Sequence, residues 1–457
     1  MSESGERLQG RRVAVLGGGL AGLTAAYRLQ ERGAEVTLYE AQPWVGGRSR
    51  TDTLDGYRVD VGTQLIGSMY RRFRRLVHEV GLGEALVPTA GRDALWRGGR
   101  AHEVVYGSVS SMIASGGLPL TTKMRLGAVY VPFLSRNAGA LDLLAPERAA
   151  AAGLDDESIA TWGEREIDRA FVRSLVYPQL GAFYGSHPDE TSAGFYHILA
   201  RYGMDVALSA VRGGVGSVAE RLATRVREGG GALCCDTAVD SLELGAGAGA
   251  VRIATAEGER VYDAAVSAVP APILAGILRG APAALTEWLS AVRYRPSLSL
   301  ALLLDAPCDV RYFGLSFPRG ETRYVAAVCV EENKLAELVP AGKGLLVAMP
   351  TPETAPALAE LESREVVDRM LPEIVKAFPD TERRIVRARV YRWPVGTPVF
   401  FPGYLRHVGN FRQSQPDAGT ALAIAGDYLY SASVEGAVAS GDDAARRLGE
   451  RLSEVDA

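Results

Sequence analysis

Residues 13 to 48, VAVLGGGLAGLTAAYRLQERGAEVTLYEAQPWVGGR, decide the fold of this chain. Residues 13 to 16 form a short apolar run typical of a strand, residues 20 to 32 have helical periodicity, and residues 35 to 39 predict a second strand. Between the first strand and the helix, the glycines follow the G-x-G-x-x-G spacing. The stretch therefore predicts a βαβ unit that binds a dinucleotide.

The three spaced glycines have separate tasks in such a unit. Gly17 permits a tight turn, Gly19 lets a pyrophosphate approach the backbone, and Gly22 lets the helix pack closely on the strand. The helix begins at Leu20 and Ala21, where unpaired N–H groups and the positive end of the helix dipole favour phosphate. These five residues are therefore predicted to hold or border the cofactor.

An acidic residue ends the second strand. Glu40 lies eighteen residues after Gly22, next to Ala41. Its carboxylate can accept hydrogen bonds from both ribose hydroxyls of an adenosine, and its charge would repel a 2′-phosphate. The pair at residues 40 and 41 is therefore predicted to meet the ribose.

The next residues narrow the cofactor. Gly46, Gly47 and Arg48 follow the acidic strand end within a few positions. In this arrangement the chain resembles the FAD-binding segment of the flavin amine oxidase superfamily, which includes amine oxidases, protoporphyrinogen oxidases and phytoene-type desaturases. The resemblance implies FAD as the cofactor and places Arg48 at the pyrophosphate, where a guanidinium can donate two hydrogen bonds to an oxyanion.

The C-terminal region carries the second part of the resemblance. Residues 422 to 427, LAIAGD, predict a strand that ends at Gly426 and Asp427, and residues 433 to 441 open the last helix. The resemblance places Asp427 at the ribitol or pyrophosphate. It directs the helix start, at Val434 and Ala437, to the N1–O2 edge of the flavin, where the helix dipole would stabilise reduced flavin.

The middle of the chain completes the expected cofactor domain. Strands are predicted at about 232 to 244 and 250 to 256, a meander in which Val239 matches the position whose backbone meets the adenine. We predict an α/β protein with a Rossmann-like FAD/NAD(P)-binding domain, a mixed-sheet substrate domain and a helical insertion. The assigned ranges are 10–66, 212–285 and 385–457 for the FAD-binding domain, 67–211 for the helical cap and 286–384 for the substrate-domain sheet.

Two positions separate this chain from amine oxidases. Those enzymes commonly hold a lysine near flavin N5, where this chain has Ser297 or Ser299, and an aromatic cage residue where it has Ser433. Residues 393 to 407 resemble instead a Trp-Pro segment of protoporphyrinogen oxidases. The candidates for the substrate pocket are therefore Trp393, Phe400 and Phe401, although aromatic residues fill cores as often as they line pockets.

We expect an FAD-dependent oxidoreductase that removes hydride from a C–C or C–N bond of a lipophilic small molecule, with O2 reoxidising the flavin. No catalytic side chain is assigned, since the flavin takes the hydride and the protein supplies orientation and electrostatics. Two alternatives stay open: an amine or amino-acid oxidase, and a non-redox flavin mutase or isomerase.

Composition limits the other classes. The net charge is −4 with no basic block, which argues against nucleic-acid binding, and the four cysteines show no metal-ligand spacing. Residues 1 to 11 are polar, and no run reaches the roughly 18 apolar residues of a membrane span, so a cytoplasmic protein is expected. Residues 104 to 134, apolar but broken by Lys123 and others, could contact a membrane surface or roof an apolar pocket. The oligomeric state stays open.

Overall fold

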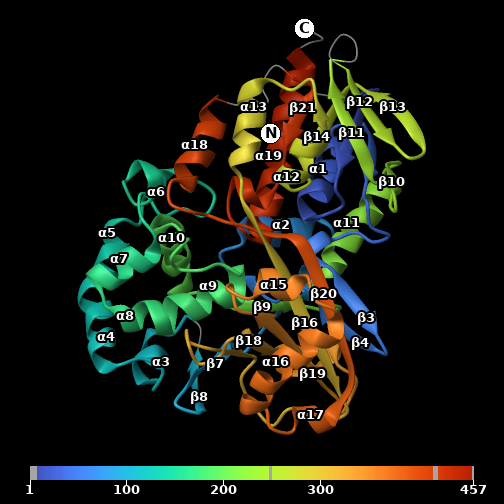
Figure 1. The fold of residues 1–457 in the computed structure, drawn as a ribbon. Helices are drawn as coiled ribbons and strands as arrows, with labels where there is room; N and C mark the ends of the chain where they lie inside the picture. The colour runs from blue at the N-terminus through green and yellow to red at the C-terminus, as the bar shows by residue number, and fades with distance from the viewer. Residues whose placement is uncertain (1–7, 106, 246–249, 415–419, 455–457) are drawn as a thin grey trace.

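A computed structural model of the chain describes residues 8–105, 107–245, 250–414 and 420–454. The first seven residues, part of the polar segment behind the cytoplasmic expectation, lie outside these ranges. Figure 1 shows an upper lobe that holds both chain ends, a helical lobe at the lower left and a sheet lobe at the lower right. No helix in the described ranges is long and apolar enough to cross a bilayer.

A parallel five-stranded sheet forms the centre of the upper lobe. Along β1, Val13 and Val15 pack on one face and Ala14 and Leu16 on the other, as strand periodicity requires. The valine face packs with three helices, and the opposite face is covered by an antiparallel meander. The strand order is β10 (Ala232–Cys234), β2 (Glu35–Tyr39), β1 (Arg12–Leu16), β14 (Ala264–Ser267) and β21 (Leu422–Ile424); the helices are α1 (Leu20–Glu31), α11 (Gly216–Glu228) and α19 (Val434–Glu454); the meander is β11 (Val239–Leu244), β12 (Val251–Thr255) and β13 (Gly258–Tyr262).

The segment predicted as one strand over 232–244 is two strands in different sheets. β10 pairs with β2 in the parallel sheet, whereas β11 belongs to the meander. Between them Asp236 has a φ of 53°, a left-handed conformation that turns the chain. The prediction of a single strand was wrong because the short turn around Asp236 leaves little trace in hydrophobic periodicity.

A seven-stranded mixed sheet forms the lower right lobe. Strand β16, second in this sheet, buries all seven residues from Leu298 to Leu304, so it needs a partner on each edge. Those partners are β19 and β20, both antiparallel to it. The helix α16 (Ser363–Ala377) packs on one face. The strand order is β20 (Ile385–Pro398), β16 (Tyr294–Leu304), β19 (Gly344–Pro350), β18 (Val325–Val330), β17 (Gly314–Ser316), β7 (Arg92–Arg97) and β8 (Arg100–Val105).

The sheet differs from the predicted division of the chain. The boundary at 385 assigned β20 to the cofactor part, and the range 67–211 was described as a helical cap, yet β20, β7 and β8 all pair within the mixed sheet. β7 joins β17 through parallel pairing across more than two hundred residues. Such a long-range pairing is set by tertiary packing and carries no local sequence pattern.

The helical lobe is built around a cluster of rings. Tyr130, Phe133 and Trp162 lie within 5.6 Å of the ring of His197, centroid to centroid. The Tyr130 hydroxyl and His197 Nδ1 are hydrogen-bonded at 3.1 Å. Burial lowers the pKa of His197 to about 3, so its ring is neutral at neutral pH and packs as an aromatic group. This core supports α9 (Tyr177–Tyr184), which borders the site described next.

Candidate functional site

A cavity of about 540 Å³ lies where the upper lobe meets the mixed sheet. Its walls come from the turn after β1, from the C-terminal region and from β16 and β20. All but one of the fifteen residues predicted to hold the cofactor line it, the exception being Gly22. Those on the wall are Gly17, Gly19, Leu20, Ala21, Glu40, Ala41, Gly46, Gly47, Arg48, Val239, Gly426, Asp427, Val434 and Ala437.

The glycine turn has the geometry that a bound phosphate requires. A Cβ added to Gly22 would lie 2.0 Å from the Gly17 carbonyl oxygen, so this glycine permits the close helix–strand contact without touching the cavity. A Cβ added to Gly19 would meet no atom within 4 Å, which leaves room for a ligand above the backbone. No side chain caps the start of α1 and no acid stands in its first turn. A dinucleotide phosphate therefore fits this end of the cavity.

The carboxylate of Glu40 is held by backbone donors. Its Oε2 accepts a hydrogen bond from Gly18 N at 2.7 Å, and its Oε1 accepts one from Gln42 N at 2.9 Å. Each carboxylate oxygen can accept a further bond, so the side chain keeps acceptors for hydroxyl groups. Its position on the cavity wall suits the predicted contact with a ribose.

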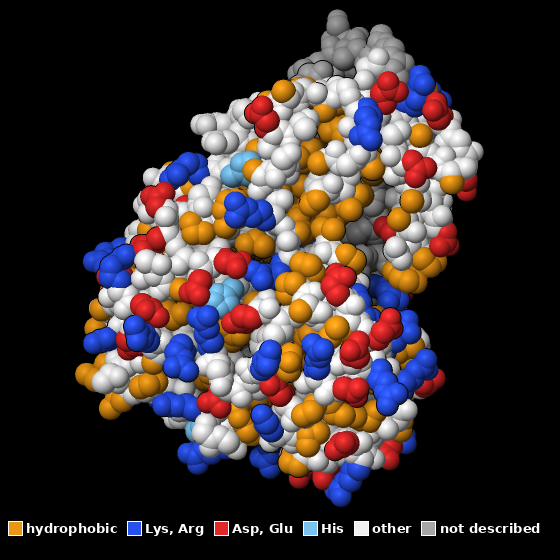
Figure 2. All heavy atoms as spheres, viewed as in Figure 1, with side chains coloured by type: hydrophobic (Ala, Val, Ile, Leu, Met, Phe, Trp, Pro, Cys, Tyr) orange, Lys and Arg blue, Asp and Glu red, His pale blue; other side chains and the backbone are white. Residues whose placement is uncertain are grey.

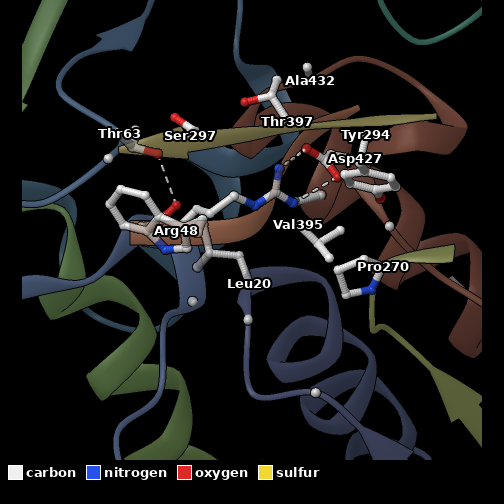
Figure 3. A pocket seen from close by; sticks show the side chains of 18 of the residues that line it. Leu20, Arg48, Thr63, Pro270, Tyr294, Ser297, Val395, Thr397, Asp427 and Ala432 are labelled. Atoms are coloured by element: carbon white, nitrogen blue, oxygen red, sulfur yellow. Dashed lines mark hydrogen bonds and ion pairs between the residues drawn. The ribbon is translucent and has the colours of Figure 1, made fainter. Parts of the chain in front are cut away.

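The arginine loop and the C-terminal motif meet in the cavity. Arg48 Nη1 and Nη2 each donate to Asp427 at 2.9 Å, and Nη1 also donates to the carbonyl of Gly396 at 3.0 Å (Figure 3). Burial alone would lower the pKa of Arg48, but the neighbouring carboxylate more than offsets this and raises it. The sequence predicted both residues in the site and did not predict that they bind each other.

Tyr294 provides a donor that the sequence analysis missed. It lies on the cavity wall near Asp427 (Figure 3), and its buried hydroxyl has no hydrogen-bond partner among the described residues. Burial and then the Asp427 carboxylate raise the pKa of Tyr294, so the phenol keeps its proton. Burying a polar group without a hydrogen bond destabilises the folded protein, so this hydroxyl indicates that a polar group of a ligand binds in the cavity.

The start of the last helix borders the same cavity. Ser433 Oγ accepts a hydrogen bond from Gly436 N at 3.1 Å and so caps α19. The buried carboxylate of Glu435 accepts bonds from the backbone N–H groups of Arg72 and Phe73, which fixes α2 (Arg71–Glu79) against α19. Ser433, where amine oxidases carry an aromatic residue, therefore has a structural task as a helix cap.

Among the described residues, no charged side chain lines the part of the cavity formed by residues 61–64, α9, β16 and β20. Phe183 and Tyr184, from α9, line the cavity together with residues of β16 and β20, so the helical lobe contributes to its lining. Trp393 also lies on this wall. The remaining lining residues here are Val61, Gly62, Thr63, Gln64, Gly181, Ala182, Gly185, Pro296, Ser297, Leu298, Ser299, Met349, Pro350, Ala355, Val395 and Thr397.

Two of the predicted pocket aromatics lie elsewhere. Phe400 is 2% exposed and stacks on Phe195 with ring centroids 4.1 Å apart, so it belongs to the core. Phe401 lines a second hollow, where the guanidinium of Arg293 lies 4.4 Å from its ring centroid. The placement of both in the main pocket was wrong because a buried aromatic and a pocket aromatic have the same sequence pattern.

The lining residues that the structure describes include no lysine. Ser297 and Ser299 both reach the cavity from β16, and Ser299 Oγ donates to the carbonyl of Val61 at 2.7 Å. Ser299 therefore holds the loop that follows β4 (Tyr57–Asp60) against the mixed sheet. The two serines expected in place of the amine oxidase lysine are on the strand where the sequence put them.

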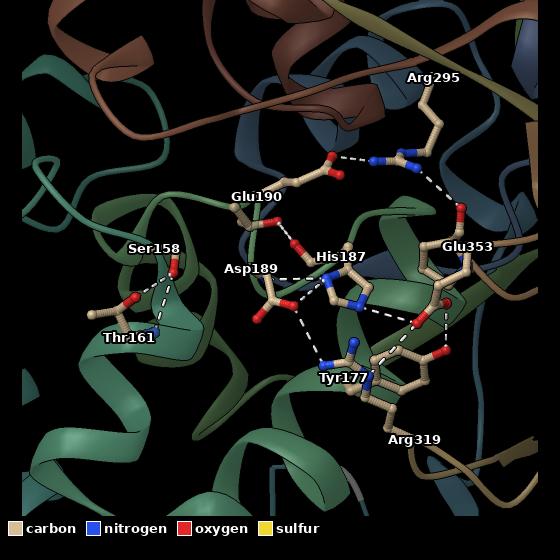
Figure 4. A network of polar contacts seen from close by, with 11 residues as sticks. Ser158, Thr161, Tyr177, His187, Asp189, Glu190, Arg295, Arg319 and Glu353 are labelled. Carbon is tan, nitrogen blue, oxygen red and sulfur yellow. Dashed lines mark hydrogen bonds and ion pairs between the residues drawn. The ribbon is translucent and has the colours of Figure 1, made fainter.

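A polar network joins the helical lobe to the mixed sheet beside the cavity (Figure 4). His187 Nε2 lies 3.0 Å from Glu353, whose other carboxylate oxygen accepts from the Tyr177 hydroxyl at 2.7 Å. Burial raises the pKa of Glu353, but the bonds from His187 and Tyr177 outweigh it and bring the value to about 2. Next to it, Glu190 and Arg295 form an ion pair at the second hollow. These contacts fix the loop after α9 over the sheet.

The family profile described as flavin containing amine oxidoreductase matches residues 20–449. The chain belongs to this family. Membership confirms the predicted superfamily, the α/β fold class, FAD as the cofactor and the class of FAD-dependent oxidoreductase.

Individual relatives differ in how much of the chain they match. Coproporphyrinogen III oxidase of Propionibacterium freudenreichii is 28% identical over 39% of this chain and 33% of its own length, so the chain spans about a third of that relative. Carotenoid phi-ring synthase of Streptomyces griseus is 27% identical over 96% of this chain and 88% of its own length. The solved structure of cyclohexylamine oxidase from Brevibacterium oxydans shares the fold with a TM-score of 0.74 at 20% identity, covering 97% of this chain and 99% of that one.

Proposed function

We propose that the protein oxidises a C–C bond of a long, uncharged, lipophilic molecule to C=C, removing a hydride from one carbon and releasing a proton from its neighbour to solvent, with a polyene of the carotenoid class as the leading case. In the part of the chain that the structure describes, no charged side chain lines the cavity wall formed by α9, β16 and β20, and this observation carries the proposal. A substrate with an ammonium or carboxylate group would lose its hydration there without gaining a counter-ion, which would weaken its binding by roughly several kcal/mol.

The match to the carotenoid phi-ring synthase supports this choice, since it extends over nearly all of both chains, whereas the coproporphyrinogen oxidase match covers a minority of each. In addition, the positions at Ser299 and Ser433 carry structural hydrogen bonds in place of the lysine and the aromatic residue typical of amine oxidases. These features weigh against the amine-oxidase alternative.

In this mechanism a bound FAD would supply the hydride acceptor. Residues of the chain bind and orient the substrate: Phe183 and Trp393 offer ring faces to a flat apolar molecule, and Tyr184 closes the wall beside them. The network around Glu353 holds the loop after α9 in place, which keeps bulk water from the reacting carbon. Arg48, Glu40 and Tyr294 would hold the FAD itself.

Anaerobic mixing tests the reaction. The FAD-loaded protein is combined with a detergent-dispersed polyene, with coproporphyrinogen and with a primary amine, and the flavin absorbance is followed. Bleaching by the polyene alone is the expected result, and admission of air should restore the colour with release of peroxide if O2 is the acceptor. Bleaching by the amine or the porphyrinogen but not by the polyene overturns the substrate proposal. If none of the three bleaches the flavin and the protein still isomerises a polyene, the result favours the non-redox alternative.

We also propose that the protein draws this substrate from a membrane surface. Ile113, Leu120 and Met124, on α3 (Val109–Ala114) and α4 (Leu120–Arg125), are 59%, 71% and 66% exposed. In Figure 2 hydrophobic side chains lie among basic ones at the left edge, where Figure 1 places these helices. Exposed apolar side chains with cationic neighbours suit an anionic bilayer surface. Co-sedimentation with anionic vesicles should fall strongly when the three residues are changed to serine; unchanged co-sedimentation contradicts this proposal.

A further inference from the structure

A group of buried charges lies directly behind the cavity wall. Lys334, Asp60 and Glu331 have side chains that are 0%, 1% and 0% exposed. Lys334 Nζ is 2.8 Å from Asp60 Oδ2 and 2.5 Å from Glu331 Oε2. Both Lys334 and Glu331 come from the short helix α14 (Glu331–Lys334), which follows β18. Three ionisable groups in a dry interior are costly to bury, so their retention at this place calls for a reason beyond packing.

A third partner of the lysine is a residue of the cavity wall. Lys334 Nζ donates to Gln64 Oε1 at 2.9 Å and to Asp60 Oδ2 at 2.8 Å, beside its ion pair with Glu331. Gln64 lines the cavity, whereas Lys334 does not reach it. The positive charge therefore acts on the cavity through the amide of Gln64.

The contacts of Gln64 fix which way its amide points. Lys334 can only donate, so the atom facing it is the amide oxygen, and the backbone carbonyl of Asp60 can only accept, so the atom facing it at 2.7 Å is Nε2. One of the two N–H bonds of Nε2 is used by Asp60, and the other remains for a ligand. The cation also polarises the amide, which makes the remaining N–H a stronger donor.

We propose that Gln64 donates a hydrogen bond to the flavin ring and that Lys334 is the positioning residue that holds it there. The inference rests on the proposed function, in which FAD occupies the cavity that residues 61–64 also line. Reduction adds electron density to the nitrogen and oxygen acceptors of the ring, so a fixed donor stabilises reduced flavin more than oxidised flavin. Asp60 keeps the lysine in place and is itself held by Thr51 Oγ1 at 2.5 Å and Val215 N at 2.9 Å.

The midpoint potential of the bound FAD tests the proposal, measured by photoreduction against a reference dye. This measurement needs no substrate, so its outcome is independent of whether the substrate is a polyene. Lys334→Met and Gln64→Leu should each shift the equilibrium toward oxidised flavin about tenfold, which is about 30 mV for a two-electron couple. Lys343→Met, a change of the same type at an exposed lysine, should leave the potential unchanged.

The double variant separates positioning from a direct effect of charge. If Lys334 acts through Gln64, adding Lys334→Met to Gln64→Leu should shift the potential no further. An equal further shift overturns the positioning role, and an unchanged potential in Gln64→Leu overturns the contact with the flavin. Gln64→Leu keeps the ion pairs of Lys334 with Asp60 and Glu331, so this second test holds even if Lys334→Met does not fold.

Discussion

Arg48 and Asp427 lie 379 positions apart in the sequence and are joined by two parallel hydrogen bonds of 2.9 Å. The pair connects the turn Gly47–Ser49 near the N-terminus with the turn Asp427–Leu429 before the last helix. Because both turns line the same cavity, segments from near the two ends of the chain form one wall of the predicted cofactor site. The guanidinium keeps further N–H bonds that can donate to phosphate.

Arg48→Lys should weaken FAD binding roughly tenfold, about 1.4 kcal/mol, because an ammonium cannot make two parallel bonds to a carboxylate while donating to phosphate. The dissociation constant is measured by titrating apoprotein with FAD and following flavin fluorescence. Arg58→Lys, at an exposed arginine of β4, serves as the matched control and should bind FAD as the unmodified protein does.

The pairing itself is tested by a double-mutant cycle. If Arg48 and Asp427 act as a unit, Arg48→Lys together with Asp427→Asn should cost less than the sum of the single changes, with a coupling of about 0.5 to 3 kcal/mol. Strict additivity would show that the two side chains contact the cofactor independently.

Glu40→Ala should reduce FAD retention at least tenfold, since each hydrogen bond to a charged acceptor contributes about 1.5 to 3 kcal/mol. FAD released during dialysis reports the loss. Glu35→Ala, at the exposed start of the same strand, is the control and should retain FAD. Equal retention in both variants would mean that the Glu40 carboxylate serves only the backbone N–H groups of Gly18 and Gln42.

The features that the sequence predicted well are local. Gly17, Gly19 and Gly22 follow a spacing dictated by one turn, and the neighbouring strands and helix have strong periodicity, so the cofactor sheet and its first helix could be located from the sequence. Fourteen of the fifteen predicted cofactor residues line one cavity, and their contact with FAD stays a prediction. The family resemblance supplied the distant Asp427, which no local pattern connects to Arg48.

The features that the sequence could not give depend on tertiary packing. Lys334 stands in the polar run Glu-Glu-Asn-Lys, which is typical of a solvated surface, yet the fold buries it beside Asp60. Likewise, the sequence around Phe400 is compatible with a pocket residue, and only its stacking contact with Phe195 in the folded protein places it in the core. The orphan hydroxyl of Tyr294 has no sequence signal, since tyrosine at a strand start is common.

Phe183→Ala should raise KM for an apolar substrate roughly tenfold and leave FAD affinity unchanged. Phe183 is 46% exposed and lines the cavity from α9, so its ring can cover part of a substrate, and losing that apolar contact costs about 1 to 2 kcal/mol. Steady-state kinetics and FAD titration measure the two effects. Val386→Ala, at an exposed position of β20 that is not among the cavity residues, should change neither. An unchanged KM in Phe183→Ala would show that the helical lobe does not contact the substrate.

Glu331 should make the stability of the protein fall as the pH rises from about 4.5 to 7. Burial raises the pKa of this carboxyl to about 7; the charge of Lys334 lowers it, and those of Asp60 and Glu332 raise it. The folded state therefore keeps a proton that the unfolded state loses, so the stabilising effect is full below the unfolded pKa and is lost as the pH passes the folded pKa. The shift corresponds to a change on the order of 3 kcal/mol in the free energy of unfolding.

Glu331→Gln isolates this contribution, because the amide resembles the protonated acid and does not titrate. Urea unfolding of the two proteins between pH 5 and pH 8 should show similar stability at the acidic end and an advantage for Glu331→Gln at the alkaline end. The difference should grow with pH, since only the unmodified protein must bury a second carboxylate charge beside the single cation of Lys334. A difference that stays constant over this range would show that Glu331 does not change its protonation there, and that Lys334 balances both carboxylates throughout.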